Sequence, residues 1–220
     1  MSKINSLLLA GAIASMPLPA FAQLPQIPGL PAESLGALAS GQGFTTSIEM
    51  TATGKMPVSR MTLYYSPHPE RVRMELRLPD LDRSMSTIAL LDEGVTYQEF
   101  GSGTWMRMPL PREALDKMRR AMKQANSEVK REILTPTTID GRLCEVTRIT
   151  QAGGGQTTLY SSKGIPVRVV QQTAQGNVTL RFVNFRQGEP QSGIFAPPPT
   201  TSVLDMGEMM KGELGDLLAE

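Results

Sequence analysis

The chain has 220 residues and a formal net charge of +1, so it fits one large domain or two small ones and lacks the basic excess of nucleic-acid-binding proteins. One cysteine and one histidine exclude an intramolecular disulfide framework, a cysteine-rich zinc site and a multi-histidine metal site. Histidine is also the commonest general base. We therefore expect no enzymatic activity and no cofactor.

The N-terminal segment predicts a secretory signal. Lys3 supplies a short positive region, residues 7–16 are apolar, and Ala20-Phe21-Ala22 forms a small-x-small cleavage site before Gln23. The apolar run is about half of the 20 residues that a membrane-spanning helix needs, and no later run approaches that length. Because Gln23 is not a cysteine, lipid attachment at a bacterial lipobox is not expected. The mature protein should be soluble in the periplasm.

After a Pro/Gly/Ala-rich lead-in over residues 23–43, apolar and polar residues alternate with a period of two, which predicts half-buried strands. The predicted strands span residues 44–53, 57–66, 70–78, 84–91, 95–100, 104–108, 133–139, 142–151, 156–162, 166–173 and 177–186. Gly, Pro, Asp and Asn occupy the short turns between them. Such short connections favour antiparallel neighbours and one long meander.

The clearest alternation lies in residues 71–78. Val72, Met74, Leu76 and Leu78 point to one face, and Arg71, Arg73, Glu75 and Arg77 point to the other. The first interpretation of the arginines is a solvated outer face, and the alternative is a patch that contacts anionic headgroups or a partner protein.

Two helices are expected to interrupt the strands. Pro111 suits the first helical position, and Leu115, Met118, Met122 and Ala125 follow at spacings of three and four. A second apolar stripe lies in the tail, at Met206, Met209, Met210, Leu214, Leu217 and Leu218. Three glycines weaken this tail helix, so it needs an apolar surface to dock on.

These elements predict a mainly β fold of the α+β type, in which a single large antiparallel sheet curls into an incomplete barrel with a helical lid. The expected divisions are a signal peptide at 1–22, a lead-in at 23–43, a half-barrel domain at 44–200 and an amphipathic helical tail at 201–220. The mouth of such a sheet is a common place for a small lipophilic ligand.

From Phe44 to Met206 the chain resembles the superfamily of the periplasmic lipoprotein carriers LolA and LolB and the sigma-factor regulator RseB, and most of all an uncharacterised LolA-like branch. The segments that carry the resemblance are Val95–Phe100, Gly103–Leu110, Ile139–Val146, Gly164–Val169, Asn177–Phe182 and Ile194–Pro199. The resemblance implies an incomplete antiparallel barrel with a helical lid and an apolar cavity.

Methionine is frequent, with 14 residues, and its flexible side chain adapts to varied apolar surfaces. For any single methionine, ordinary core filling is the plainer interpretation. The candidates for the apolar cavity or its lid are Met61, Leu63, Val72, Met74, Leu76, Trp105, Met118, Met122, Val169, Leu180, Phe182, Met209 and Met210. Trp105 fits either a rim contact or a plain core position. Cys144 is expected to be buried as a small hydrophobic residue.

The sequence thus favours a binding protein that holds a lipophilic ligand or the acyl part of a lipoprotein in an apolar cavity. The alternative is a ligand-free envelope interaction or stress-sensing module of the same fold. In either case the partner is a lipid, an acylated lipoprotein or an envelope protein, and not a nucleic acid.

The cleavage site generates a first testable prediction. The periplasmic protein should begin at Gln23 and carry no lipid, because Ala20-Phe21-Ala22 ends the signal and the next residue is Gln23 and not a cysteine. N-terminal sequencing and intact-mass measurement of the secreted fraction check this. Protein that retains Met1 in the cytosol contradicts it.

Overall fold

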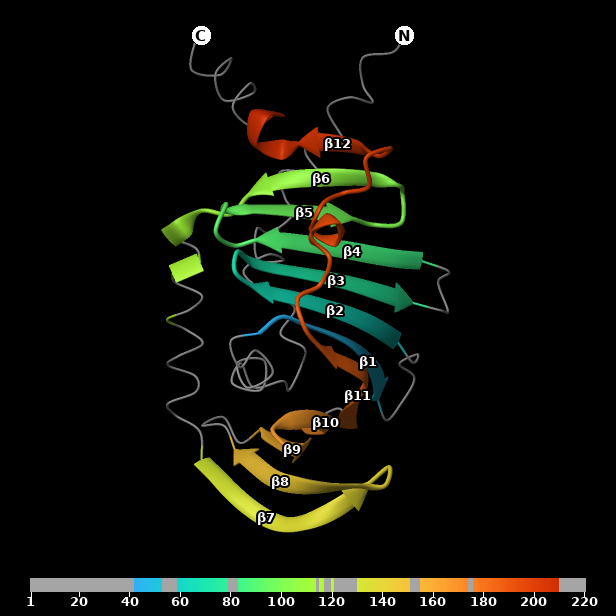
Figure 1. The fold of residues 1–220 in the computed structure, drawn as a ribbon, viewed down its shortest axis with the longest axis vertical. Coiled ribbons are helices and arrows are strands. Elements are labelled where there is room, and N and C mark those ends of the chain that lie inside the picture. Colours follow the sequence, from blue (N-terminus) through green and yellow to red (C-terminus); the bar gives the residue numbers. More distant parts are fainter. Residues whose placement is uncertain are drawn as a thin grey trace.

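The structure of the protein is a computed structural model, and it describes residues 42–52, 59–78, 83–113, 115–116, 120, 130–150, 155–173 and 176–209. Within these residues the chain is almost entirely β, and the strands belong to one sheet (Figure 1). The alternation of apolar and polar residues accounts for this, because successive side chains of a strand point to opposite faces of the sheet.

The first six strands are β1 (Phe44–Ala52), β2 (Ser59–Pro67), β3 (Glu70–Leu78), β4 (Arg83–Leu90), β5 (Val95–Glu99) and β6 (Thr104–Pro109). The others are β7 (Lys130–Ile139), β8 (Arg142–Thr150), β9 (Gln156–Ser162), β10 (Ile165–Thr173), β11 (Gly176–Gln187) and β12 (Ser202–Asp205), and a short 3-10 helix, η3 (Ser192–Phe195), precedes β12. The first eleven strands agree with the predicted ones to within about three residues at each end. The turns also agree, since Asp140-Gly141 and Lys163-Gly164 both have positive φ at two successive residues, as tight hairpin turns require.

The order of strands differs from the expected single meander. It runs β12-β6-β5-β4-β3-β2-β1-β11-β10-β9-β8-β7, so β1 to β6 form one meander and β7 to β11 form a second. Antiparallel pairing of β1 with β11 joins them, with Ile48 opposite Phe182 and Met50 opposite Leu180. Residues 110–129 therefore connect two strands at opposite ends of the sheet. A prediction from local sequence patterns does not specify which distant strands pair with each other.

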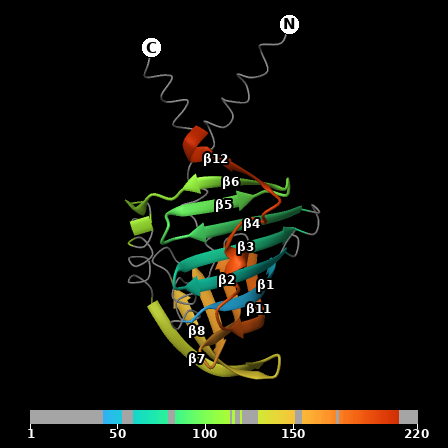
Figure 2. The same cartoon turned by 45° about the horizontal axis from the view of Figure 1, so that its top comes forward.

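The sheet is curled but not closed, which confirms the expected incomplete barrel. Figure 2 shows the strands at the β7 end turning behind β1 and β2, while the edge strands β7 and β12 lie at opposite ends. Among the expected helical residues 111–125, residues 112, 113, 115, 116 and 120 are helical, and the remainder beyond 113 lie outside the described residues. The helical lid therefore stays a prediction.

The C-terminal segment corrects the expected helical tail in its first residues. Ser202–Asp205 form β12, which pairs in parallel with β6 and makes the sheet mixed. Only Met206–Met209 are helical among the described residues beyond it. The extended form of residues 202–205 follows from the unpaired edge of β6, whose backbone groups β12 satisfies.

The two faces of the sheet bury different side chains. We define the inner face by the largest core cluster, which consists of Phe44, Ile48, Met61, Leu63, Met74, Val169, Leu180 and Phe182. The outer face carries the alternate positions of the same sheet, including Arg60, Arg73, Trp105 and Arg181. The segment Gly188–Thr201, here called the strap, crosses the outer face in front of β3 and β4 (Figure 1).

The face assignment predicts unequal effects for two substitutions on β3. Met74→Asp should lower the free energy of unfolding by at least about 3 kcal/mol, because it places a carboxylate among buried apolar side chains. Arg77→Asp should change it by about 0.5 kcal/mol or less, because Arg77 is exposed on the outer face. Urea unfolding of both variants measures the difference, and equal midpoints would show that the faces are assigned wrongly.

Candidate functional site

The inner face is an apolar surface that runs across both meanders. At its centre, Ile48 of β1 lies opposite Met61 of β2 and Phe182 of β11, so one row of buried side chains crosses the junction. The next row joins Leu63 of β2 to Met74 of β3. Each of these residues belongs to the same buried cluster. The surface is therefore continuous from one meander to the other.

Around this buried centre the inner face stays apolar but becomes more accessible. Met50, Val72, Leu76, Leu159 and Val178 are half-buried and pack against the central cluster. The strand register extends the inner face onto β4, where Met85 lies opposite Leu76. It also extends the face to β6, because the cross-strand row that starts at Met74 passes through Thr87 and Gln98 and ends at Met106. Met85, Met106 and Met108 are half-buried. Methionines thus occupy the more accessible part of the inner face.

A few uncharged polar groups interrupt the apolar surface. The Thr46 hydroxyl is fully buried and donates a hydrogen bond to the Val183 carbonyl at 3.3 Å. Gln171 lies on β10 opposite Val178 and Thr157, and its Oε1 atom is buried without a hydrogen-bond partner. A buried acceptor without a partner costs free energy, typically about 1–3 kcal/mol. A ligand that offers an N–H or O–H group could satisfy this atom.

The structure brings eight of the predicted site residues together on the inner face. They are Met61, Leu63, Val72, Met74, Leu76, Val169, Leu180 and Phe182. Met118, Met122 and Met210 lie outside the residues that can be described. Met209 lies in the helical turn after β12 and is 49% exposed. Ligand binding by these residues stays a prediction.

The prediction missed the contribution of β1. Phe44 and Ile48 are among the most completely buried side chains of the inner face, and Met50 packs beside them. The alternation Phe44, Thr46, Ile48, Met50 was a signal that could have found them, since these positions share one face of a strand. What the alternation does not contain is the position of β1 at the junction of the two meanders.

Trp105 lies on the outer face and not with the inner candidates. It is 3% exposed and packs with Ile88, Leu90 and Phe195, which comes from η3 in the strap. Half-buried Tyr64, Tyr97 and Ile194 surround this second cluster. The uninterrupted run Ile88–Leu91 signalled it, because a strand that is apolar at successive positions is buried on both faces. Trp105 is therefore a core residue under the strap.

The same strap corrects the interpretation of Arg71 and Arg73 as solvated. The side chain of Arg73 is only 14% exposed, and its Nη1 donates to the Ile194 carbonyl at 2.6 Å. Its guanidinium lies 5.8 Å from the Trp105 ring centre, and that of Arg71 lies 4.6 Å from the Phe195 ring centre. Both are cation–π distances. Only Arg77 of the three is exposed.

Two carboxylates form ion pairs with these arginines. Glu75 lies 2.8 Å from Arg73, and Glu189 lies 3.6 Å from Arg71. Burial raises the pKa of Tyr64, and the adjacent Glu75 carboxylate raises it further. The Nε atoms of both arginines are nevertheless buried without a partner. The strap is thus held by aromatic stacking on arginine and by one strong charge-assisted hydrogen bond.

An ion pair fixes the end of β12 against β6. Arg107 Nη1 donates to Asp205 Oδ2 at 2.6 Å, and the N–H groups of Gly207 and Glu208 donate to Asp205 Oδ1 at 2.9 and 3.2 Å. The hydrogen bond from Arg107, supported by those from the backbone, holds the pKa of Asp205 below its usual range. Asp205 therefore both pairs across the strands and caps the helical turn that follows.

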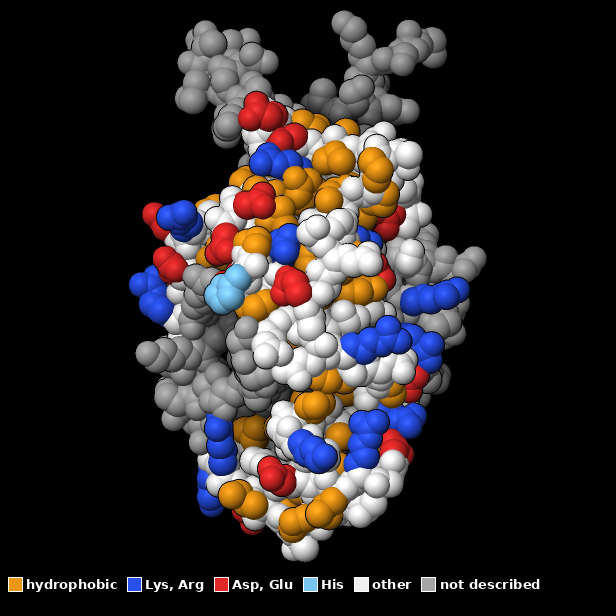
Figure 3. Space-filling view, in the orientation of Figure 1, with side chains coloured by type: hydrophobic (Ala, Val, Ile, Leu, Met, Phe, Trp, Pro, Cys, Tyr) orange, Lys and Arg blue, Asp and Glu red, His pale blue; other side chains and the backbone are white. Residues whose placement is uncertain are grey.

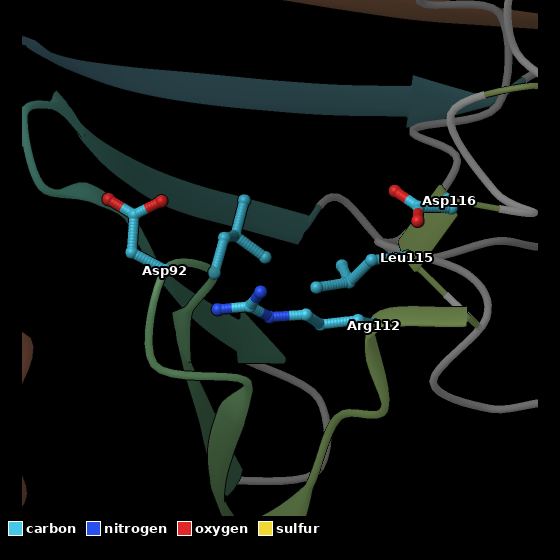
Figure 4. A pocket seen from close by; sticks show the side chains of 5 residues that line it. Asp92, Arg112, Leu115 and Asp116 are labelled. Atoms are coloured by element: carbon cyan, nitrogen blue, oxygen red, sulfur yellow. The ribbon is translucent and has the colours of Figure 1, made fainter.

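A separate hollow of about 260 Å³ lies between the β4–β5 turn and the residues that follow β6. Leu91, Asp92, Arg112, Leu115 and Asp116 line it, and Figure 4 shows Arg112 extending toward Asp92 with Leu115 alongside. Asp92 also accepts a hydrogen bond from the Glu70 N–H at 2.8 Å. Charges of both signs make this hollow unlike an acyl-chain site, which is apolar.

Two further observations concern metal ions and membranes. Within the described ranges, no three His, Cys, Asp or Glu side chains are grouped so that they could hold a metal ion. Across the same ranges, every helix is too short or too polar to span a bilayer. Cys144 is fully buried, as expected, and its thiol donates to the Arg142 carbonyl at 3.4 Å.

Comparison with known proteins gives matches in structure only. Neither a protein-family model nor a curated protein sequence matches the chain. An uncharacterised conserved protein from Thermus thermophilus is similar with a TM-score of 0.55 and 13% identity, over 79% of this chain and 98% of that one. The lipoprotein LppX of Mycobacterium tuberculosis gives a TM-score of 0.45 and 16% identity, over 73% and 94% of the two chains.

The MucA/MucB complex from Pseudomonas aeruginosa gives a TM-score of 0.41 and 13% identity, over 79% of this chain and 62% of that one. Among these likenesses, the Thermus thermophilus structure is the one close enough to support an argument, and at 13% identity it shows the fold alone. The comparison thus shows that this chain and the uncharacterised Thermus thermophilus protein share a fold.

The strap generates a prediction with a matched control. Phe195→Ala should lower the free energy of unfolding by about 3–5 kcal/mol, because it empties the site between Arg71, Ile88 and Trp105. Trp105 is the single tryptophan, so its emission should shift to longer wavelength as water reaches it. Phe100→Ala removes a phenylalanine that is 44% exposed and should leave both measurements near those of the wild type. Similar losses in the two variants would contradict the buried strap.

Proposed function

We propose that the protein binds a lipophilic ligand, or the acyl part of a lipoprotein, against the inner face of its sheet. The observation that carries this proposal is the distribution of methionine on that face. Met61 and Met74 are buried at its centre, and Met50, Met85, Met106 and Met108 remain half-buried around them. Flexible thioether side chains can repack around an acyl chain and close again when it leaves.

The expected affinity is consistent with a reversible carrier. Each methylene moved from water to an apolar surface contributes about 0.8 kcal/mol, so about fourteen of them contribute roughly 11 kcal/mol. Association costs about 4 kcal/mol or more. The difference corresponds to a Kd in the micromolar range. The unpartnered Oε1 of Gln171 offers an acceptor for a donor group at the polar end of the ligand.

The proposed place of action is the periplasm, on the basis of the signal peptide that the sequence predicts at residues 1–22. The alternative function is a ligand-free envelope interaction or stress-sensing module. It is favoured by the exposed apolar side chains of the β12 end, Val203, Leu204 and Met209. Exposed apolar side chains at the end of a sheet favour docking of a partner protein.

A titration distinguishes the two functions and provides the fourth prediction. A fluorescent fatty-acid analogue should bind the delipidated protein with a micromolar Kd. The double variant Met85→Gln and Met106→Gln should raise that Kd by about tenfold or more, because two accessible inner-face contacts become polar. Val203→Gln, on the exposed outer side of β12, should leave the Kd unchanged.

Native mass spectrometry of protein purified without detergent supplies the second measurement. A ligand-bound mass that disappears on delipidation supports the proposal. If the analogue fails to bind at micromolar concentration and the purified protein carries no ligand, the carrier function is wrong and the interaction module is the better account.

A further inference from the structure

A row of arginines crosses the outer face at the junction of the two meanders. In register order it consists of Arg77 on β3, Arg60 on β2, Glu49 on β1, Arg181 on β11 and Arg168 on β10, and we call it the arginine row. Neighbouring strands lie about 4.8 Å apart, so the row spans roughly 19 Å. Figure 3 shows Lys and Arg side chains following one another over the right half of this face, from the level of β3 downward.

The register places like charges directly opposite one another at both ends of the row. Arg60 is the cross-strand partner of Arg77, and Arg168 is the partner of Arg181. Like charges in directly opposite positions destabilise a sheet. A face that needs only solubility would place opposite or neutral side chains there, so the two pairs point to a function that needs concentrated positive charge.

The carboxylates near the row do not neutralise it. Glu49 lies 2.7 Å from Arg60 and 3.6 Å from Arg181, and Asp140 lies 3.1 Å from Arg181. Neither Arg77 nor Arg168 is paired with a carboxylate of the described residues. The four arginines of the row therefore outnumber the two carboxylates that pair with them, Glu49 and Asp140, although the whole chain is close to neutral.

Other arginines of the outer face behave differently. Arg71, Arg73, Arg107 and Arg148 each have a carboxylate within 3.6 Å, namely Glu189, Glu75, Asp205 and Glu132. One-to-one pairing is thus the rule for these arginines. The arginine row differs from them because Arg77 and Arg168 each face another arginine across the strands.

The surroundings of the row indicate what it binds. Hydroxyl side chains are frequent at the flanking outer positions, with Ser47 and Thr62 on one side and Thr51, Thr158 and Thr179 on the other. Glu75 and the half-buried Val170 and Val183 also flank the row. Protein interfaces are centred on large apolar and aromatic anchors, whereas the apolar side chains of these flanking rows are the valines Val170 and Val183. A flat surface of arginines among hydroxyl groups suits the phosphates of lipid headgroups, which guanidinium groups bind through paired hydrogen bonds.

We propose that the arginine row docks the protein on an anionic phospholipid surface. This inference does not rest on the proposed ligand function, because it uses the opposite face of the sheet. Docking through the outer face leaves the inner face free. A basic residue near an anionic membrane strengthens binding by a few fold, and this attraction decays within a Debye length.

The test is co-sedimentation of the full protein with vesicles of phosphatidylcholine, alone or mixed with phosphatidylglycerol. The protein should bind the mixed vesicles only, and added salt should release it. The variant Arg77→Gln with Arg168→Gln should lower the partition coefficient by roughly 10- to 30-fold. The matched control, Arg112→Gln with Lys130→Gln, removes two exposed charges outside the row and should retain binding.

Thermal unfolding adds an independent measurement. Because Arg77 and Arg168 each face another arginine, the row variant should melt at the wild-type temperature or above it. A lower midpoint would show that these arginines stabilise the fold and would overturn the argument.

Three binding outcomes also overturn the proposal. They are equal binding to neutral vesicles, equal binding by wild type and row variant, and an equal loss in the control. Binding to heparin without binding to mixed vesicles would assign the row to an acidic polymer instead. The fatty-acid titration is unaffected by any of these results, so failure of the row leaves the proposed ligand function to its own test.

Discussion

The antiparallel pairing of β1 with β11 is the constraint on which the rest of the structure depends. It joins two local meanders into one sheet, and it brings together residues that lie far apart in the sequence, such as Ile48 and Phe182. Ile48 and Leu180, which are both about 1% exposed, lie at this junction. Because closing so large a loop costs entropy, the apolar area buried there has to compensate for it. The continuous inner face and the arginine row both exist only because this pairing forms.

Much of the fold was predictable because strands obey a local rule. Alternation with a period of two and the turn residues between strands placed eleven strands, and they placed eight candidate residues on one face. The order of strands was not predictable in this way, since short turns say nothing about how two meanders meet. β12 was not predicted for a related reason. Its four residues lie next to an apolar helical stripe in the sequence, and they become a strand only because the edge of β6 is available for pairing.

The arginines of β3 show where pattern alone fails. Arg71, Arg73 and Arg77 share one face and one alternation, and yet two of them lie beneath the strap and one is exposed. The difference comes from neighbouring strands, where Ile88, Leu90 and Trp105 create an apolar surface that Phe195 covers. A guanidinium can enter such a place because its flat face stacks on aromatic rings while its edge forms hydrogen bonds. Tertiary context therefore decides whether a periodic arginine is structural or accessible.

The sheet thus separates two kinds of chemistry across the thickness of a single layer. Apolar burial is short-ranged and needs contact, so a surface that adapts to a hydrophobic chain is best placed on the curled inner side, where Met61 and Met74 are already sheltered. Charge acts at about the Debye length and needs exposure to water, so it belongs on the outer side. Since successive side chains of a strand point to opposite faces, Met61 and Arg60 can serve these two purposes from adjacent positions without interfering with each other.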